Sequence, residues 1–138
     1  MIHKIQASAN SYIALEVVNQ KLLMSKILST GRAADSLLEF TQQQTQQLNS
    51  IIQSITGNYL PKEYGKIQIG NKILKILLST FRGITTLQIR ERVTSGEYAG
   101  FGKLGISLPT YKIKELQTHM TTTLKEFSAP LVDDVQKL

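Results

Sequence analysis

The stretch from Arg32 to Gly57, RAADSLLEFTQQQTQQLNSIIQSITG, carries an uninterrupted hydrophobic repeat of the kind found in helical bundles. The repeated positions follow one another at steps of three and four residues, which keeps them on one side of a helix with 3.6 residues per turn. These positions are Ala34, Leu37, Thr41, Gln44, Leu48, Ile51 and Ile55. The opposite face is rich in glutamine and uncharged. The pattern predicts a helix over 32–57 that packs against a partner helix.

The segment before this stretch predicts a second helix, from Asn10 or Ser11 as its cap to about Ser29, with Gly31 ending it. Only a few residues separate the two predicted helices, so we expect an antiparallel hairpin over 10–57 preceded by an extended arm over 1–9. The apolar residues of the first helix fall on two sides. Its second side is expected to contact either another helix of the same chain or another subunit.

The remainder of the chain predicts two further helices and a glycine-rich insert. Residues 58–70 are a turn-rich connection, and 71–83 have the spacing of an amphipathic, cationic helix. Residues 84–93 alternate as a strand does, although continuation of the helix is the competing interpretation. Residues 94–107 are expected to form a loop or a small β ribbon. A helix follows Pro109, and a short last helix is expected over 131–138; no internal repeat is evident.

We therefore predict a mainly α or α-rich α+β fold, built from the hairpin and two further helices. The 138 residues suffice for one compact domain that buries a sizeable core. A hydrophobic content of 41% together with 19% charged residues is typical of a globular chain rather than a disordered one. The most apolar segment is far shorter than the about 20 residues that a membrane-spanning helix needs, so no membrane span is expected.

Several kinds of chemistry find little support in the residue types present. The chain has no cysteine, which excludes disulfides, thiolate nucleophiles and sulfur-ligated metals. Its two histidines are far apart in sequence, and Glu115 with His119 is a lone helical pair that usually makes a surface contact. The motif GFGKLG at 100–105 has the spacing of a dinucleotide-binding loop but not its strand–loop–helix context. We predict no catalytic residue, cofactor or metal site, and no enzyme activity.

The net charge of +6 is concentrated in the middle of the chain, which suggests a polyanion as one partner. Residues 58–83 contain five Lys or Arg and a single Glu, and so carry +4. The candidate polyanion contacts are Lys62, Lys66, Lys72, Lys75, Arg82, Arg90 and Arg92. The simpler interpretation is that these residues solvate the outer side of a helix. A basic nucleic-acid-binding protein is accordingly the second of two functions to be tested.

The first function is that of a structural subunit acting through protein–protein contacts, and we expect it to form homo-oligomers in an assembly such as a phage particle or a secretion device. The candidate self-association residues are Leu37, Thr41, Gln44, Leu48, Ile51 and Ile55. A polar residue in an apolar seam, here Gln44, can specify register and oligomeric state. The alternative is that Gln44 lies at the wetted edge of an intramolecular bundle. No signal peptide is recognised, so we expect a location in the cytoplasm or in a particle assembled there.

Overall fold

The fold consists of two four-stranded antiparallel sheets and two helices. The structure is a computed structural model, which describes residues 1–93 and 100–128. Its elements are β1 (Ile2–Ser8), β2 (Ser11–Val18), β3 (Lys21–Leu28), β4 (Ala33–Thr41), α1 (Gln42–Gln53), β5 (Lys62–Ile69), β6 (Lys72–Phe81), β7 (Ile84–Val93), β8 (Gly100–Pro109), the short 3-10 helix η1 (Thr110–Lys112) and α2 (Ile113–Ser128). The first sheet has the order β1-β2-β3-β4 and the second sheet the order β5-β6-β7-β8.

The prediction of a mainly helical fold is therefore wrong, and so is the hairpin of helices over 10–57. The described part of the chain instead contains the same unit twice: four strands in sequential order, then a helix. The predicted arm at 1–9 contains β1, and the predicted connection at 58–70 contains β5. A repeat that the sequence does not display is thus present in the structure, because topology can repeat while side chains diverge.

The segment 10–29, predicted as one helix, forms β2 and β3 joined by a tight turn. Asn19 and Gln20 adopt positive φ angles of 53° and 63°, as both central residues of a type I′ hairpin turn do. Ser11, Ile13 and Leu15 are buried while their neighbours are not, which is the period of two expected for a strand. The apolar residues of 10–29 fell on two sides of the predicted helix because they follow the strand period of two in β2 and β3, and the turn between these strands interrupts that period.

The predicted helix at 71–83 is also wrong, since these residues form β6 and its turn into β7. Leu74, Ile76 and Leu78 are buried in the core. Ile73, Leu77 and Phe81 on the other face of the strand are apolar as well, so the period of two was masked. The strand interpretation of 84–93 is confirmed as β7, and the helix after Pro109 is confirmed as α2.

The opening stretch at 32–57 divides into a strand and a helix at Thr41. Thr41 caps α1: its Oγ1 accepts a hydrogen bond from the Gln44 amide at 3.2 Å, and the Gln44 Oε1 accepts one from the Thr41 amide at 2.9 Å. This reciprocal pair is a capping box, with glutamine at its third helical position. The Gln44 Nε2 also donates to the Gln68 carbonyl at 3.3 Å, which ties α1 to β5.

Gln44→Leu is expected to destabilise the fold by about 1 kcal/mol, because it removes half of the capping box. If Gln44 lay in the apolar seam of a helical bundle, leucine at this position would instead be expected to stabilise the fold. Urea unfolding of Gln44→Leu measures the effect, with Gln46→Leu at an exposed position of the same helix as the control. A Gln44→Leu variant as stable as the control would show that the cap contributes nothing.

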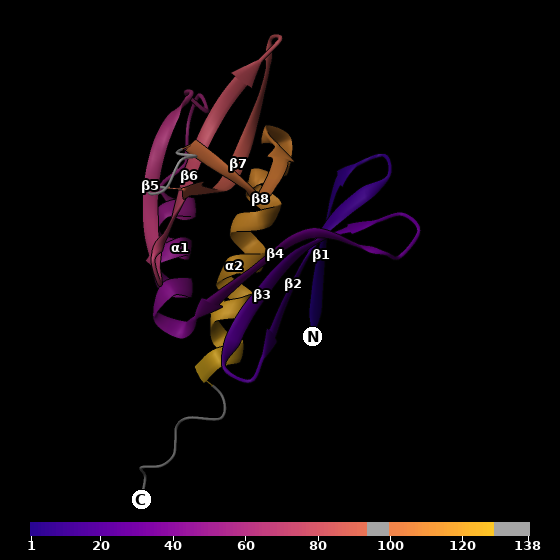
Figure 1. Cartoon of the computed structure of the whole chain (residues 1–138), viewed down its shortest axis with the longest axis vertical. Helices are drawn as coiled ribbons and strands as arrows, with labels where there is room; N and C mark the ends of the chain where they lie inside the picture. The colour runs from indigo at the N-terminus through magenta and orange to yellow at the C-terminus, as the bar shows by residue number, and fades with distance from the viewer. Residues whose placement is uncertain (94–99, 129–138) are drawn as a thin grey trace, which may run out of the picture.

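The two repeats are interlocked, because each helix packs on the sheet of the other repeat. Helix α1 follows the first sheet, yet its Ile51 packs on Gly65 of β5. Helix α2 follows the second sheet, yet it contacts β1 and β2, where the His3 Nε2 lies 2.8 Å from a carboxylate oxygen of Glu126. In Figure 1 α2 runs through the middle of the molecule, α1 lies at the lower left beside the second sheet, and the first sheet lies to the right of α2. Neither repeat buries its helix alone.

The helices also contact each other through amide side chains. The Gln117 Nε2 donates to the carbonyl oxygens of Ile52 and Ile55 at 3.0 and 2.9 Å, and the Gln53 Nε2 donates to the Gln117 carbonyl at 2.8 Å. The Ile52 carbonyl also accepts a hydrogen bond from the Ile55 amide at 3.1 Å, so the Gln117 side chain adds a second donor at the end of α1. The polar side of α1 is thus used in part within the monomer, at its junction with α2.

Gly65→Ala is expected to destabilise the protein by about 1–3 kcal/mol through overpacking. A Cβ atom at this position would lie 2.6, 2.7 and 3.0 Å from three side-chain atoms of Ile51. Thermal or urea unfolding measures the loss. Gly105→Ala is the control, since a Cβ there meets its nearest neighbour at an ordinary 3.5 Å. In an Ile51→Ala background the Gly65→Ala penalty should disappear, and its persistence there would contradict the packing argument.

Two predicted features fall wholly or partly outside the described residues. These are the short helix over 131–138 and the first part of the glycine-rich insert, 94–99. The rest of that insert, from Gly100, forms β8. Among the described residues, no helix is both long and apolar enough to cross a membrane.

Candidate functional site

The second sheet has one face that packs on the core and one that faces away from it. Leu74, Ile76, Leu87, Ile89 and Ile106 point to the core and are at most 3% exposed. The residues that alternate with them form the outer face of the second sheet. Since successive side chains of a strand point to opposite sides, the register between strands determines which outer residues are neighbours.

Three cations lie opposite one another on that outer face. Lys66 of β5 is paired in register with Lys75 of β6, and Lys75 is paired with Arg90 of β7. The next partner in line is Gly105 of β8. Neighbouring strands are about 4.8 Å apart, so the three side chains form a closely spaced line, here called the cationic row. The sequence named all three residues but placed two of them in other kinds of structure.

A carboxylate and an amide accompany the cationic row. The Lys75 Nζ contacts a Glu63 carboxylate oxygen at 2.8 Å, and an Arg90 nitrogen lies 3.5 Å from the Gln88 side-chain oxygen. Glu63 is 40% exposed, so this ion pair is screened by solvent and contributes little to stability. Lys75 can exchange its partner for another anion at small cost.

The other four predicted polyanion contacts are distributed differently. Arg92 lies on the same outer face, opposite Ile73. Lys72 belongs to the opposite face and pairs with the buried Glu91 at 3.6 Å. Lys62 stands over the Tyr64 ring at 4.9 Å, and Arg82 lies over Phe81 at 5.1 Å in the β6–β7 turn. The structure thus brings four of the seven together on one face: Lys66, Lys75, Arg90 and Arg92.

Beside the cationic row lies an apolar part of the same face. A hollow of about 510 Å³ is lined by Leu77, Ser79, Phe81, Ile84, Thr86, Gln88 and Arg90. Phe81 and Ile84 are 71% and 66% exposed at the tip of the β6–β7 hairpin, which projects at the top of Figure 1. The sequence placed Phe81 on the apolar face of the predicted helix over 71–83 and Ile84 at the start of the strand-like segment 84–93. The Arg82-Gly83 pair between them, with φ angles of 54° and 78°, was the signal for a hairpin tip.

The tyrosines nearest the cationic residues in the sequence, Tyr59 and Tyr64, are directed toward the core. Tyr59 and Tyr64 both pack against the hydrophobic core, and the Tyr64 hydroxyl donates to the Leu60 carbonyl at 2.9 Å. Neither ring lies on the outer face beside the cationic row. Phe81 is the exposed aromatic residue that takes this place.

The outer face of the first sheet has the same position in its repeat but a different composition. Its hollow, of about 250 Å³, is lined by Ile2, Lys4, Tyr12, Ala14, Glu16, Leu23, Ser25, Ile27 and Leu37. The Lys4 ammonium lies 5.2 Å from the centre of the Tyr12 ring. The face carries two lysines, Lys4 and Lys21, and two glutamates, Glu16 and Glu39. The Lys21 Nζ lies 3.9 Å from a carboxylate oxygen of Glu39. Among its described side chains, this face is apolar with balanced charge.

The predicted self-association residues occupy several environments. Leu48 and Ile55 are buried within the monomer, Ile51 packs on Gly65, and Thr41 and Gln44 form the cap of α1. Leu37 is 47% exposed and lines the hollow of the first sheet. Of this set, Leu37 alone combines high exposure with an apolar neighbourhood.

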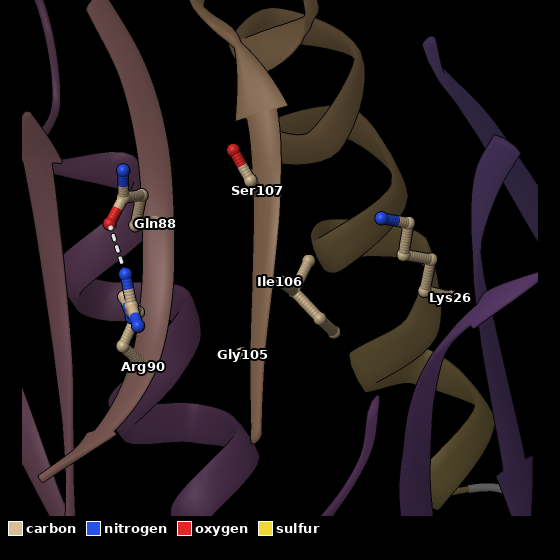
Figure 2. A pocket seen from close by; sticks show the side chains of 6 residues that line it. All are labelled: Lys26, Gln88, Arg90, Gly105, Ile106 and Ser107. Carbon is tan, nitrogen blue, oxygen red and sulfur yellow. Dashed lines mark hydrogen bonds between the residues drawn. The ribbon is translucent and has the colours of Figure 1, made fainter. Parts of the chain in front are cut away.

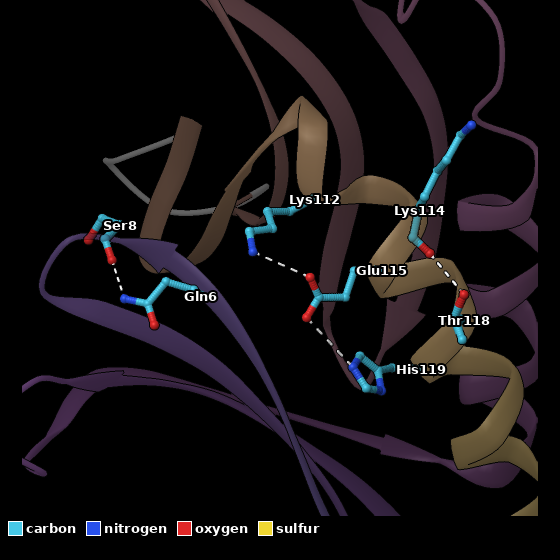
Figure 3. Close-up of polar contacts among 7 residues, drawn as sticks. All are labelled: Gln6, Ser8, Lys112, Lys114, Glu115, Thr118 and His119. Atoms are coloured by element: carbon cyan, nitrogen blue, oxygen red, sulfur yellow. Dashed lines mark hydrogen bonds and ion pairs between the residues drawn. The ribbon is translucent and has the colours of Figure 1, made fainter.

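The histidines form a polar junction between β1 and α2. Figure 3 shows Lys112 of η1 with Glu115 and His119 of α2. The Lys112 Nζ and the His119 Nε2 lie 3.4 and 3.8 Å from the carboxylate oxygens of Glu115. Gln6 and Ser8 of β1 are drawn in the same region. The His3 and His119 rings are 5.0 Å apart. Among residues 1–93 and 100–128, no three or more His, Asp or Glu side chains come together in a way that could hold a metal ion. The junction is a contact between the two repeats.

The glycine motif at 100–105 lies in β8, antiparallel to β7. A dinucleotide-binding loop instead joins a strand directly to the amino end of a helix. Here the first helical turn starts only at Thr110, after the strand has ended. The geometry does not match that of a nucleotide site.

No protein-family model matches the chain, and no curated protein is similar to it.

Proposed function

We propose that the protein is a non-enzymatic binding protein that holds single-stranded nucleic acid on the outer face of its second sheet. The observation that carries this proposal is the alignment of Lys66, Lys75 and Arg90 across three neighbouring strands. Cations in a line match a chain of phosphates, whereas scattered surface cations do not.

Single strands suit this face better than duplexes. The reading of duplex sequence usually needs a helix or a two-stranded ribbon that enters the major groove. Both α helices in the described part of the chain pack against the sheets. The outer face instead offers Phe81, Ile84 and Leu77 beside the cations. Unpaired bases can stack on an aromatic ring, at about 1–3 kcal/mol per base, while their phosphates contact Lys and Arg.

The salt dependence of oligonucleotide binding tests the proposal. Four phosphates held by Lys66, Lys75, Arg90 and Arg92 correspond to a slope of log K against log salt of about −3, at about −0.7 per phosphate for a single strand. Fluorescence anisotropy with single-stranded DNA, single-stranded RNA and the matching duplex gives this slope. We expect binding of at least one single strand in preference to the duplex. No binding of any of the three at low salt would exclude the proposal.

A structural role in an assembly is the second candidate function, favoured by the apolar hollow on the first sheet. A contiguous exposed apolar patch often marks a contact with another protein, and the balanced charges of this face would not repel a second copy. The two functions are compatible, because they use different sheets. Either would place the protein where nucleic acid or an assembling particle is found, in the cytoplasm or in a particle formed there.

Leu37→Glu is expected to weaken any self-association, because it puts a charge into the apolar hollow. Sedimentation velocity of the wild type and the variant measures this, with Leu60→Glu as the control at another exposed leucine, 59% accessible. An oligomer that dissociates in Leu37→Glu alone supports the assembly role. A wild-type protein that is monomeric at all concentrations removes the self-association form of it.

A further inference from the structure

A pocket of about 190 Å³ lies where the two sheets approach each other, at the end of the cationic row. Figure 2 shows its lining: Gln88 and Arg90 of β7, Gly105, Ile106 and Ser107 of β8, and Lys26 of β3. Lys26 belongs to the first repeat and the other five residues to the second. The pocket therefore exists only because the repeats are interlocked.

The lining has the chemistry of an oxyanion site. It combines a guanidinium, an ammonium, an amide and a hydroxyl, and none of its six residues is acidic. Arg90 presents the planar N–H donors of a guanidinium, and Lys26 presents an ammonium group on a flexible side chain. Both groups bind phosphate in proteins. The Gln88 side-chain oxygen, 3.5 Å from an Arg90 nitrogen, helps to orient the guanidinium. The volume is far above the about 15 Å³ that one water needs, so a tetrahedral oxyanion fits with part of its hydration.

Lys26 reaches this pocket from the inner side of the first sheet. It is paired in register with the buried Ile13, and its own side chain is half-buried. Figure 2 shows the chain of Lys26 extending toward β8, with its ammonium group on the side of Ile106. A lysine in such a position buries its aliphatic stem and delivers its charge to the nearest polar opening. Here that opening is the pocket.

Gly105 keeps the pocket open at the point where the cationic row meets it. Lys66, Lys75, Arg90 and Gly105 are successive partners across β5 to β8. Because Gly105 has no side chain, nothing from this position separates Arg90 from the space in front of Lys26. The line of positive charge thus continues from the second sheet to the first, with the pocket as its last position.

We infer that this pocket binds a phosphate group, and that Lys26 extends the nucleic-acid path from the second sheet onto the first repeat. The inference rests on the proposed function for the source of the phosphate, which is one phosphate of the bound strand. The pocket chemistry is the same for free inorganic phosphate, so the two sources are tested separately.

The first experiment titrates inorganic phosphate at constant ionic strength and follows the backbone amide resonances of Gly105, Ile106 and Ser107 by NMR. We expect saturable shifts in the wild type and in Lys21→Gln, a control at the exposed end of the same strand. Lys26→Gln should abolish them. Ser107→Asp, a second variant at an exposed position, should also abolish them by placing a carboxylate in the pocket. Shifts absent from the wild type, or unchanged in both variants, would overturn the inference.

The second experiment measures the salt slope of single-strand binding in the same proteins. Lys26→Gln should make the slope shallower by about 0.7, the contribution of one phosphate, while Lys21→Gln should leave it unchanged. An unchanged slope in Lys26→Gln, with normal binding by the wild type, refutes the extended path and leaves the proposed function in place. Phosphate shifts without any oligonucleotide binding refute the proposed function and leave a site for a small oxyanion.

Discussion

Replacing Lys66, Lys75 and Arg90 together by glutamine is expected to weaken binding of a single-stranded oligonucleotide roughly 100-fold, at about 1 kcal/mol for each exposed ion pair. The three side chains are aligned across β5, β6 and β7, so they contact consecutive parts of one strand. The salt slope should fall by about 2, since each phosphate contributes about 0.7. Anisotropy titrations over a range of salt concentrations measure both quantities.

The matched control replaces Lys21, Lys112 and Lys114 by glutamine. Each triple variant lowers the net charge by three, from +6 to +3. The control residues lie on β3, η1 and α2, away from the outer face of the second sheet. If affinity depended only on total charge, the two variants would bind equally weakly. Equal loss in both would mean that the cationic row has no special role.

Phe40→Ala is expected to destabilise the protein by about 3–5 kcal/mol, whereas Phe81→Ala should change stability by less than about 0.5 kcal/mol. The Phe40 side chain is fully buried between the sheets and helices, and Phe81 is 71% exposed at the hairpin tip. Truncation of Phe40 leaves a cavity in the core. Urea unfolding of the two variants measures how the free energy of unfolding depends on burial for the same Phe→Ala change.

The same pair gives the opposite order in binding. Phe81→Ala should weaken single-strand binding by about 1–3 kcal/mol if one base stacks on the ring, which is about 5- to 150-fold. Phe40→Ala, studied at a temperature where it is folded, should bind as the wild type does. A Phe81→Ala variant with unchanged affinity would remove the stacking contact and leave the phosphate contacts alone as the basis of binding.

Local sequence patterns predicted some elements well and others wrongly, for an identifiable reason. Helix α2 was predicted because its apolar residues, such as Leu116 and Met120, are spaced four apart and Pro109 precedes them. Strand β7 was predicted because its polar and apolar residues alternate cleanly. In β6, and across the β2–β3 turn, apolar residues occupy both faces. There the strand period was masked, and a helix was inferred.

The sequence named the cationic residues of the candidate site, but it did not predict that they lie side by side on one surface. Sequence alone named Lys66, Lys75 and Arg90 as cations of the middle of the chain. Their alignment depends on the register of two strand pairs, which no local pattern specifies. Lys26 was not named at all, because it is distant in sequence from Gly105 and Ser107 and approaches them only through the interlocked repeats.

By itself, the sequence determined the chemistry that this protein can use: no thiols, two histidines, and an excess of six positive charges concentrated around residues 58–83. It also determined where α2 forms, because helical periodicity is a local property, and it offered the strand β7 as one of two interpretations of residues 84–93. Only the tertiary structure decided that the chain builds two sheets, that each helix crosses to the sheet of the other repeat, and that the cations become neighbours. The physical reason is that strand pairing and helix packing join residues distant in sequence, and their free energy depends on contacts that a local pattern does not contain.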